Sequence, residues 1–188
     1  EAAAEAAKGP VLSEPVRAAL EAALGKEAHG ELTPLPIAFG DKATRLMLQL
    51  PVPPDARPAA PADPAAAAPP LKLAVLVRSK DGKDAARREA PAELKSARGD
   101  LFVDLSVPVE PGDYEVAAIL LDAAGAVKAS SRASLSVPPL PEGLGLSSLL
   151  LAATDLPAEG AKGDEPFVFA TRKFVARSGN AFLKTDGL

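Results

Sequence analysis

The chain has 188 residues, a formal net charge of −4 and no cysteine. Its acidic and basic residues are interspersed, so no basic stripe is present, and this argues against a nucleic-acid partner. The lack of cysteine excludes disulfides, thiolate nucleophiles and cysteine-based zinc sites. The longest apolar run, residues 144–154, is interrupted by two serines and is too short to span a bilayer, so no membrane span is predicted.

A short amphipathic helix is predicted near the N-terminus. Ser13 is a suitable N-cap residue, Pro15 lies in the first turn, and Gly25 stands where a C-cap glycine would. Between them, apolar residues recur at helical spacing: Val16, Leu20, Ala23 and Leu24. Helices this short seldom hold without a partner surface. We therefore assign residues 1–30 to a helical N-terminal segment that docks on the rest of the chain or on an upstream domain.

Seven strands are expected next, because apolar and polar residues alternate with the two-residue period of half-buried strands. The apolar positions of the first three are Leu35, Ile37 and Phe39; Leu46, Leu48, Leu50 and Val52; and Leu71, Leu73, Val75 and Val77. The other four lie at residues 85–90, 101–109, 114–120 and 127–137. Each strand is expected to have one apolar face.

Three local features refine these strands. Pro51 requires a sheet edge or a strand end, and the charges of residues 85–90 predict an edge strand. Asp81-Gly82 is a strong turn signal and predicts a hairpin between the third and fourth strands. Residues 53–70 consist mainly of Pro and Ala, and we expect them to form a mobile, extended loop that can neither pack nor pair.

The most informative motif is the turn Pro111-Gly112-Asp113, which is followed by Tyr114 at the head of an alternating strand. This is typical of a tyrosine corner, in which the phenol crosses between two strands and bonds to nearby backbone. Tyr114 is the only tyrosine, and the chain has no tryptophan. The motif predicts an all-β fold: residues 31–138 form an immunoglobulin- or fibronectin type III-like sandwich whose structural corner is Pro111, Gly112 and Tyr114.

Residues 139–188 are predicted to be a linker and a partial second β unit. The linker begins in the proline-rich segment 138–141. Apolar residues then gather at strand spacing, and four of the six phenylalanines lie after residue 165. Two hypotheses stay open for Phe167, Phe169 and Phe174: an exposed contact surface for a partner, or the core of a truncated second unit.

Few residues suggest chemistry. His29 is the only histidine, and it lies in a polar stretch with no Gly-x-Ser-x-Gly elbow in the chain, which favours a solvated loop residue. Asp164 and Glu165 are adjacent carboxylates flanked by Gly163 and Pro166, a pattern that favours a turn. The sequence therefore offers no catalytic residue and no residue that binds a cofactor.

Four carboxylates around the fifth predicted strand are candidate calcium ligands: Asp100, Asp104, Glu110 and Asp113. Calcium needs several oxygens that converge from loops. Asp104, however, is expected to point outward in mid-strand, and no dense Asp/Asn loop is present. Turn and surface roles are favoured for these carboxylates, and no metal ligand is predicted.

The order of these elements resembles a known family. The resemblance is carried by the helix SEPVRAALEAAL, the strands TPLPIAFGDKATRLMLQLPV and LKLAVLVRSKDGK, and the meander LFVDLSVPVEPGDYEVAAILLDAAGAVKASSRASLSVP; the tail LGLSSLLLA and FVFATRKFVARSGNAFLKTDGL completes it. Over most of residues 13–188 the chain resembles the C-terminal region of exported bacterial proteins with a von Willebrand factor A-related domain of the acidobacterial type. The resemblance implies β-sandwich modules, an exported location (periplasm, cell surface or extracellular) and a role in architecture or protein contact.

The metal-dependent adhesion site of that family needs an Asp-x-Ser-x-Ser loop. The nearest string here, residues 104–108, has Pro108 in place of the second Ser, so no metal-binding residue is carried over.

We thus expect a non-enzymatic structural or protein-interaction module of an exported bacterial protein. Its partner would be another protein or a neighbouring domain that this chain lacks, because the chain is expected to be a piece of a longer protein. No cofactor is expected, and a small-molecule ligand is disfavoured. The alternative is a carbohydrate- or surface-binding module. Such sites present aromatic residues on a sheet face, and only 4% of this chain is aromatic.

Overall fold

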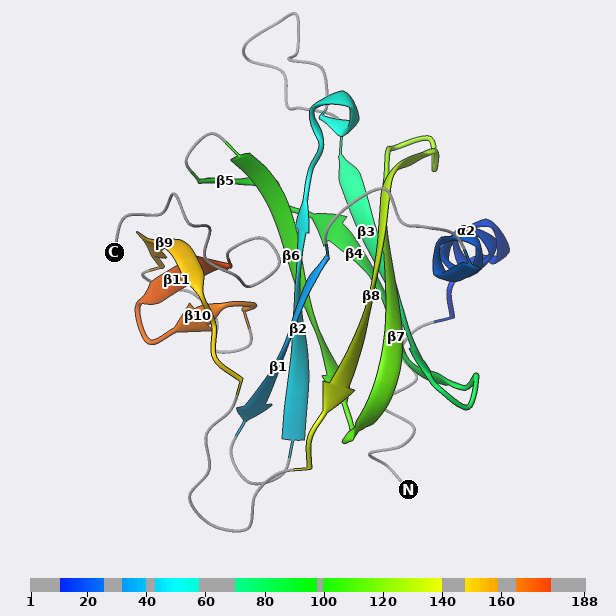
Figure 1. The fold of residues 1–188 in the computed structure, drawn as a ribbon. Coiled ribbons are helices and arrows are strands. Elements are labelled where there is room, and N and C mark those ends of the chain that lie inside the picture. The colour runs from blue at the N-terminus through cyan, green and yellow to red at the C-terminus, as the bar shows by residue number, and fades with distance from the viewer. Residues whose placement is uncertain are drawn as a thin grey trace, which may run out of the picture.

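The computed structural model describes residues 11–25, 32–39, 43–57, 70–97, 100–139, 148–158 and 165–176. Two four-stranded antiparallel sheets pack face to face (Figure 1). The first has the order β1-β2-β6-β5 and consists of β1 (Thr33–Phe39), β2 (Ala43–Pro51), β5 (Lys95–Ala97) and β6 (Asp100–Val109). The second has the order β4-β3-β7-β8 and consists of β3 (Leu71–Ser79), β4 (Asp84–Ala92), β7 (Gly112–Leu121) and β8 (Val127–Val137).

This strand order is that of an immunoglobulin-like sandwich, with one strand added beside the third. The predicted all-β sandwich is therefore confirmed. The main core lies between the two sheets and is formed by alternate residues of their central strands: Leu46, Leu48 and Leu50; Val103, Leu105 and Val107; Leu73, Val75 and Val77; and Val116, Ala118 and Leu120. The two-residue period of the sequence thus marks the inner faces.

The outer face of the second sheet is also apolar, because the helix α2 (Glu14–Gly25) covers it (Figure 1). Leu20, Ala23 and Leu24 of α2 are buried against the outer-facing residues of β3 and β7, which are Ala74, Leu76, Ala117, Ile119 and Leu121. The expectation of one apolar face per strand is wrong for these two strands. A sheet covered on both sides needs apolar side chains on both sides. At the end of α2, Arg132 of β8 donates to the Leu24 carbonyl oxygen at 2.6 Å.

The edges of the sandwich differ in part from expectation. β4 is an edge strand, as predicted, and Pro51 is the last residue of β2. Arg88 of β4 donates to the Ser106 carbonyl oxygen of β6 at 2.7 Å, and this bond links an edge strand of the second sheet to the first sheet. The sandwich has eight strands instead of the seven predicted. The additional strand is β5, whose three residues are too few to show a two-residue period.

The start of the Pro/Ala segment is ordered. Residues 54–56 form the short 3₁₀ helix η1 (Pro54–Ala56), and Ala56 is buried in the main core. The expectation that residues 53–70 cannot pack is therefore wrong for their first turn. A proline in the first turn has the backbone torsion that such a turn requires. Residues 58–69, the rest of the predicted mobile loop, lie outside the described residues.

At the corner between β6 and β7, the phenol of buried Tyr114 donates to the Glu110 carbonyl oxygen at 2.8 Å. This is the contact that defines a tyrosine corner. Gly112 leaves room for the phenol, because a Cβ atom at that position would lie 3.2 Å from its oxygen. Pro111 precedes it as an exposed turn residue.

Titration of Tyr114 provides a first prediction. Burial, assisted by the charge of Glu110, raises the pKa of the phenol above its ordinary value. Because Tyr114 is the only tyrosine, ultraviolet absorbance of the tyrosinate reports this group alone. We expect a midpoint above that of the unfolded chain. The folded state favours the neutral phenol, so the free energy of unfolding should fall as the pH rises above about 10.

Tyr114→Phe is the control for this titration. The variant cannot ionise at this position, so it should lose this alkaline component of the pH dependence. At neutral pH it should cost about 1 kcal/mol through the missing hydrogen bond to Glu110. A wild-type midpoint at or below that of the unfolded chain would contradict the prediction.

A third sheet covers the outer face of the first sheet (Figure 1). It is antiparallel, with the order β10-β11-β9, and consists of β9 (Ala152–Pro157), β10 (Val168–Phe169) and β11 (Arg172–Ala176). We call residues 148–158 and 165–176 the C-terminal β unit. The described structure thus has four layers: α2, the two sheets of the sandwich, and the C-terminal β unit. No helix in the described ranges is both long and apolar enough to cross a membrane.

Candidate contact site between the sandwich and the C-terminal β unit

The outer face of the first sheet carries large apolar side chains. Leu35 and Ile37 of β1, Met47 of β2 and Phe102 of β6 all point away from the main core, and all are buried. We call these four residues, together with Asp104 of β6, the docking face. An outer sheet face in contact with water is normally polar. The docking face therefore has the composition of a buried surface, and the C-terminal β unit covers it.

Phe167 anchors the C-terminal β unit on this face. Its side chain is 0% exposed and lies in one cluster with Leu35, Ile37 and Met47. Its backbone N–H donates to the Met47 sulfur at 3.2 Å. The φ of Phe167 is 58°, a left-handed conformation that costs on the order of 1–3 kcal/mol in a bulky residue and persists only where packing imposes it.

For Phe167, these positions contradict the first of the two hypotheses, that of an exposed contact surface. Phe167 is buried, so it cannot contact a partner while the unit is docked. Phe169 and Phe174 are half-buried, and their rings lie 5.8 Å apart at 59°. The apolar docking face explains the difference, since burial of an aromatic ring against it removes both surfaces from water. Phe182, the fourth phenylalanine of the tail, lies outside the described residues.

A partly buried ionic cluster lies beside Phe167. Lys173 of β11 and Asp104 of β6 are 2.5 Å apart, and their side chains are only 5% and 4% exposed. Lys95 of β5 pairs with Asp104 at 3.2 Å and with Glu165 at 2.9 Å. Lys173 also donates to the Pro166 carbonyl oxygen. We call Lys95, Asp104, Glu165 and Lys173 the ionic cluster; its two positive and two negative formal charges cancel.

The position of Asp104 is a second correction. Asp104 does point to the outer face, as its place in the strand predicted, but the C-terminal β unit covers that face and buries its side chain. The sequence showed the direction of the side chain, and it did not show the unit that covers it.

The two lysines of the cluster differ. Burial lowers the pKa of Lys173, and the neighbouring Lys95 lowers it further, against the opposing attraction of Asp104. Burial also acts to lower the pKa of Lys95, but the carboxylates of Asp104 and Glu165 outweigh it and raise that pKa. Burial of the charged form is therefore less favourable for Lys173 than for Lys95. Asp104 is the closest carboxylate to the Lys173 ammonium, at 2.5 Å.

The candidate calcium ligands do not converge. Asp104 is engaged by two lysines, and Asp113 pairs with Lys80 at 2.8 Å, a contact that lowers the pKa of Asp113. Asp100 and Glu110 are exposed. Within the described ranges, no three or more His, Asp or Glu side chains are grouped so that they could hold a metal ion. His29 and Asp164 lie outside these ranges.

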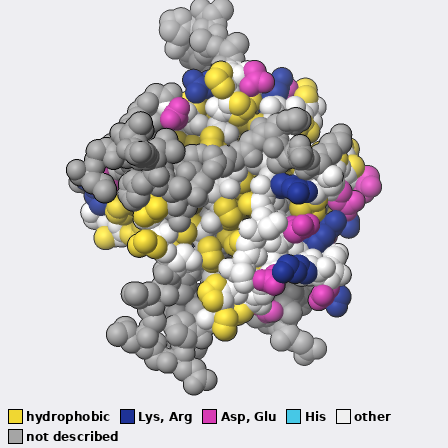
Figure 2. Space-filling view, in the orientation of Figure 1, with side chains coloured by type: hydrophobic (Ala, Val, Ile, Leu, Met, Phe, Trp, Pro, Cys, Tyr) yellow, Lys and Arg dark blue, Asp and Glu magenta, His cyan; other side chains and the backbone are white. Residues whose placement is uncertain are grey.

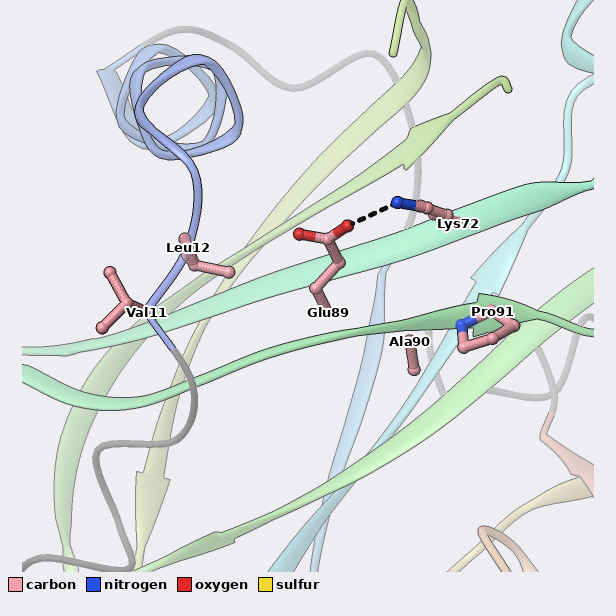
Figure 3. A pocket seen from close by; sticks show the side chains of 6 residues that line it. All are labelled: Val11, Leu12, Lys72, Glu89, Ala90 and Pro91. Atoms are coloured by element: carbon pink, nitrogen blue, oxygen red, sulfur yellow. Dashed lines mark hydrogen bonds and ion pairs between the residues drawn. The ribbon is translucent and has the colours of Figure 1, made fainter. Parts of the chain in front are cut away.

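A groove of about 350 Å³ lies near the start of α2, away from the docking face (Figure 3). Its walls are Val11 and Leu12 on one side and Ala90 and Pro91 on the other. Lys72 and Glu89 pair across it at 3.1 Å, so each neutralises the other. The groove offers an ion pair that is already satisfied and small apolar walls, and we assign it no ligand.

The surface shows the same contrast between apolar and charged regions. In Figure 2, hydrophobic side chains gather towards the left, the region that the C-terminal β unit occupies in Figure 1, whereas charges of both signs alternate on the right. Leu149 of the C-terminal β unit is 76% exposed. The mixed charges on the right resemble an ordinary solvated surface, so we place the candidate contact site on the docking face and the unit that covers it.

The hairpin between β10 and β11 provides a second prediction. Its turn contains Ala170 with a φ of 54°, a conformation that glycine adopts without strain. We expect Ala170→Gly to stabilise the C-terminal β unit by about 0.5–1 kcal/mol, measured by the protection of β11 amides in hydrogen exchange. Ala124→Gly, at an exposed turn residue without positive φ, is the matched control and should not stabilise the chain. Equal effects of the two substitutions would contradict the argument.

The fold and this site define a β-sandwich module. No family model and no curated protein matches the sequence. Among solved structures, the chain is similar to a β-glucuronidase from glycoside hydrolase family 2, with a TM-score of 0.41 and 11% identity over 57% of this chain and 11% of that chain. It is also similar to a protein assigned as a β-galactosidase from Bacteroides fragilis, with a TM-score of 0.39 and 14% identity over 57% of this chain and 16% of that chain. The chain thus spans a small part of the length of these proteins.

Proposed function

We propose that the protein is a non-enzymatic β-sandwich module with a structural or protein-contact role in an exported bacterial protein. The observation that carries the proposal is the docking face, where an outer sheet face is built of Leu35, Ile37, Met47 and Phe102 and holds a further β unit. Such a face has the composition of an interface core, which is apolar and poor in charge. The one charge set into it, Asp104, is paired.

Both outer faces of the sandwich pack against further segments of the chain, and this supports the proposed structural role. The second sheet packs against α2 through Leu76 and Ile119, and the first packs against the C-terminal β unit through Met47 and Phe102. The sandwich is thus a packing surface on two sides. This is the property of a module that holds neighbouring segments in place. The exported bacterial setting rests on the resemblance of residues 13–188 to von Willebrand factor A-related proteins.

The carbohydrate-binding alternative receives no support from the described aromatic side chains. Phe102, Tyr114 and Phe167 are buried, and Phe169 and Phe174 are half-buried. A sugar-binding platform needs an aromatic ring that is open to solvent.

Cross-linking of the protein in its native source, followed by peptide mapping, tests the proposal. A lysine-directed reagent should react with exposed Lys80 and Lys128 and leave Lys173 unmodified while the unit is docked. The proposal expects cross-links to another protein, or to a further domain in a species larger than 19.1 kDa. Specific binding on a glycan array, or turnover of chromogenic glycosides or esters by the purified chain, would contradict it.

A further inference from the structure

We infer that the docking face also accepts the C-terminal β unit of a second copy of this chain, so that two copies can exchange these units reciprocally. The inference rests on the proposed function, because it names a partner for the docking face. In the exchanged dimer, Phe167 and Lys173 of each copy would lie on Leu35, Met47 and Asp104 of the other. Such exchange forms a dimer at low cost, since every contact of the single chain is reused.

The first argument is that the C-terminal β unit has its own hydrogen bonds. β10, β11 and β9 form a sheet that is separate from both sheets of the sandwich. Its loop bonds are internal too: Phe174 N–H donates to the Phe167 carbonyl at 2.8 Å, and Ala158 N–H donates to the Thr171 carbonyl at 2.9 Å. Side chains form most of the contact with the docking face. The unit can therefore leave the face without loss of its own ladder.

The second argument is that the docking face is unfavourable when bare. Leu35, Ile37, Met47 and Phe102 are between 1% and 6% exposed in the docked state. Burial of each such side chain contributes about 1.5–3 kcal/mol, and contiguous exposed apolar patches promote association. An undocked chain should therefore take up whatever complementary surface is available. The surface with the best complement is the C-terminal β unit of another copy.

The third argument is specificity. Asp104 and Lys173 are both almost fully buried and pair at 2.5 Å. Lys95 of the sandwich also pairs with Asp104, at 3.2 Å, but an unrelated apolar surface would bury Asp104 without the second of its two cationic partners, which is unfavourable. The docking face therefore selects a β unit that places a cation beside an aromatic anchor, as Lys173 stands 5.8 Å from the centre of the Phe167 ring.

A charge-exchange experiment tests the inference with the full chain. Asp104→Lys and Lys173→Asp each place like charges together within one chain, whereas a mixture of the two variants matches opposite charges in both exchanged contacts. We expect either variant alone to show undocked units, with β11 amides that exchange about 100-fold faster than in the wild type. The equimolar mixture should form a dimer with restored protection, measured by light scattering after size-exclusion chromatography. The chain with both substitutions matches its charges internally and should remain monomeric at the same dilute concentration.

A mixture that stays monomeric and unprotected, while the doubly substituted chain is docked, would overturn the inference. If either single variant fails to fold alone, the two chains are refolded together, and the same mass and protection are measured. A second test avoids buried charge changes. Phe169 packs against the apolar cluster that contains Ile37. Because the chain has no cysteine, Phe169→Cys and Ile37→Cys in separate chains give one thiol each, and a short bismaleimide can join the two positions only between chains.

The bismaleimide yield should exceed that of the matched control, Lys128→Cys with Ile37→Cys, and the excess should rise with protein concentration. Equal yields would overturn exchange. This outcome is distinct from failure of the proposed function, because cross-links of the native protein to other partners would be unaffected.

Discussion

Phe167→Ala is expected to detach the C-terminal β unit and to leave the two sheets of the sandwich folded. Phe167 is 0% exposed against the docking face, and loss of a buried phenylalanine ring costs about 3–5 kcal/mol. The backbone strain at Phe167 remains, because alanine is no better suited to a φ of 58°. We expect increased binding of a dye that fluoresces on apolar surface, and proteolytic cleavage within residues 148–176, with little loss of strand signal in circular dichroism.

Phe169→Ala is the matched control for this experiment, because Phe169 lies on the same hairpin and is only half-buried. It should cause a smaller change in dye binding and cleavage. If Phe167→Ala instead unfolds the whole chain in one step, the sandwich and the C-terminal β unit are one cooperative unit. The role assigned to Phe167 as an anchor of a separate unit would then be wrong.

Asp104→Ala is expected to weaken docking by about 3 kcal/mol, because it leaves Lys173 buried beside Lys95 with only the more distant carboxylate of Glu165, at 3.9 Å. The double variant Asp104→Leu with Lys173→Met removes both charges and should recover most of the docking free energy, since apolar residues can replace a buried ion pair. The recovery is measured as the coupling in a double-mutant cycle, with protection of β11 amides as the readout.

The exposed pair of Lys80 and Asp113 is the control for the charge argument. It has a similar geometry, 2.8 Å, but its side chains are 73% and 46% exposed. Lys80→Met should therefore change stability little. If Asp104→Ala were equally mild, or if the double variant were as weakly docked as the single one, the ionic cluster would not contribute to docking.

Much of the sandwich could be predicted because inner-facing residues repeat every second position. Leu46, Leu48 and Leu50 of β2 illustrate this, and Tyr114 at the head of β7 identified the corner. The short strand β5 could not be predicted, because a three-residue strand has no period to detect. Local patterns predict elements with several repeats and miss those held only by a neighbouring strand.

The docking face was missed for a different reason. Met47 and Phe102 stand at outward positions where polar residues were expected. Leu35 and Ile37 were expected as the apolar face of the first strand, but that face is turned outward, away from the main core. A similar signal existed in the second sheet, where the runs Leu73–Val77 and Val116–Leu121 are apolar without interruption, as in strands buried on both faces. The pairing of Asp104 with Lys173 joins segments that are distant in sequence, and no local pattern contains it.

Native-state hydrogen exchange of the intact wild-type chain, resolved by segment, tests the central claim most directly. That claim is a sandwich that carries a separately docked C-terminal β unit. The amides of β9 and β11 should exchange through an opening of lower free energy than those of β2, β3, β6 and β7, and this opening should depend less on denaturant. Equal free energies and equal denaturant dependence in all of these strands would mean a single cooperative unit, and would contradict both the docking face and the exchange built on it.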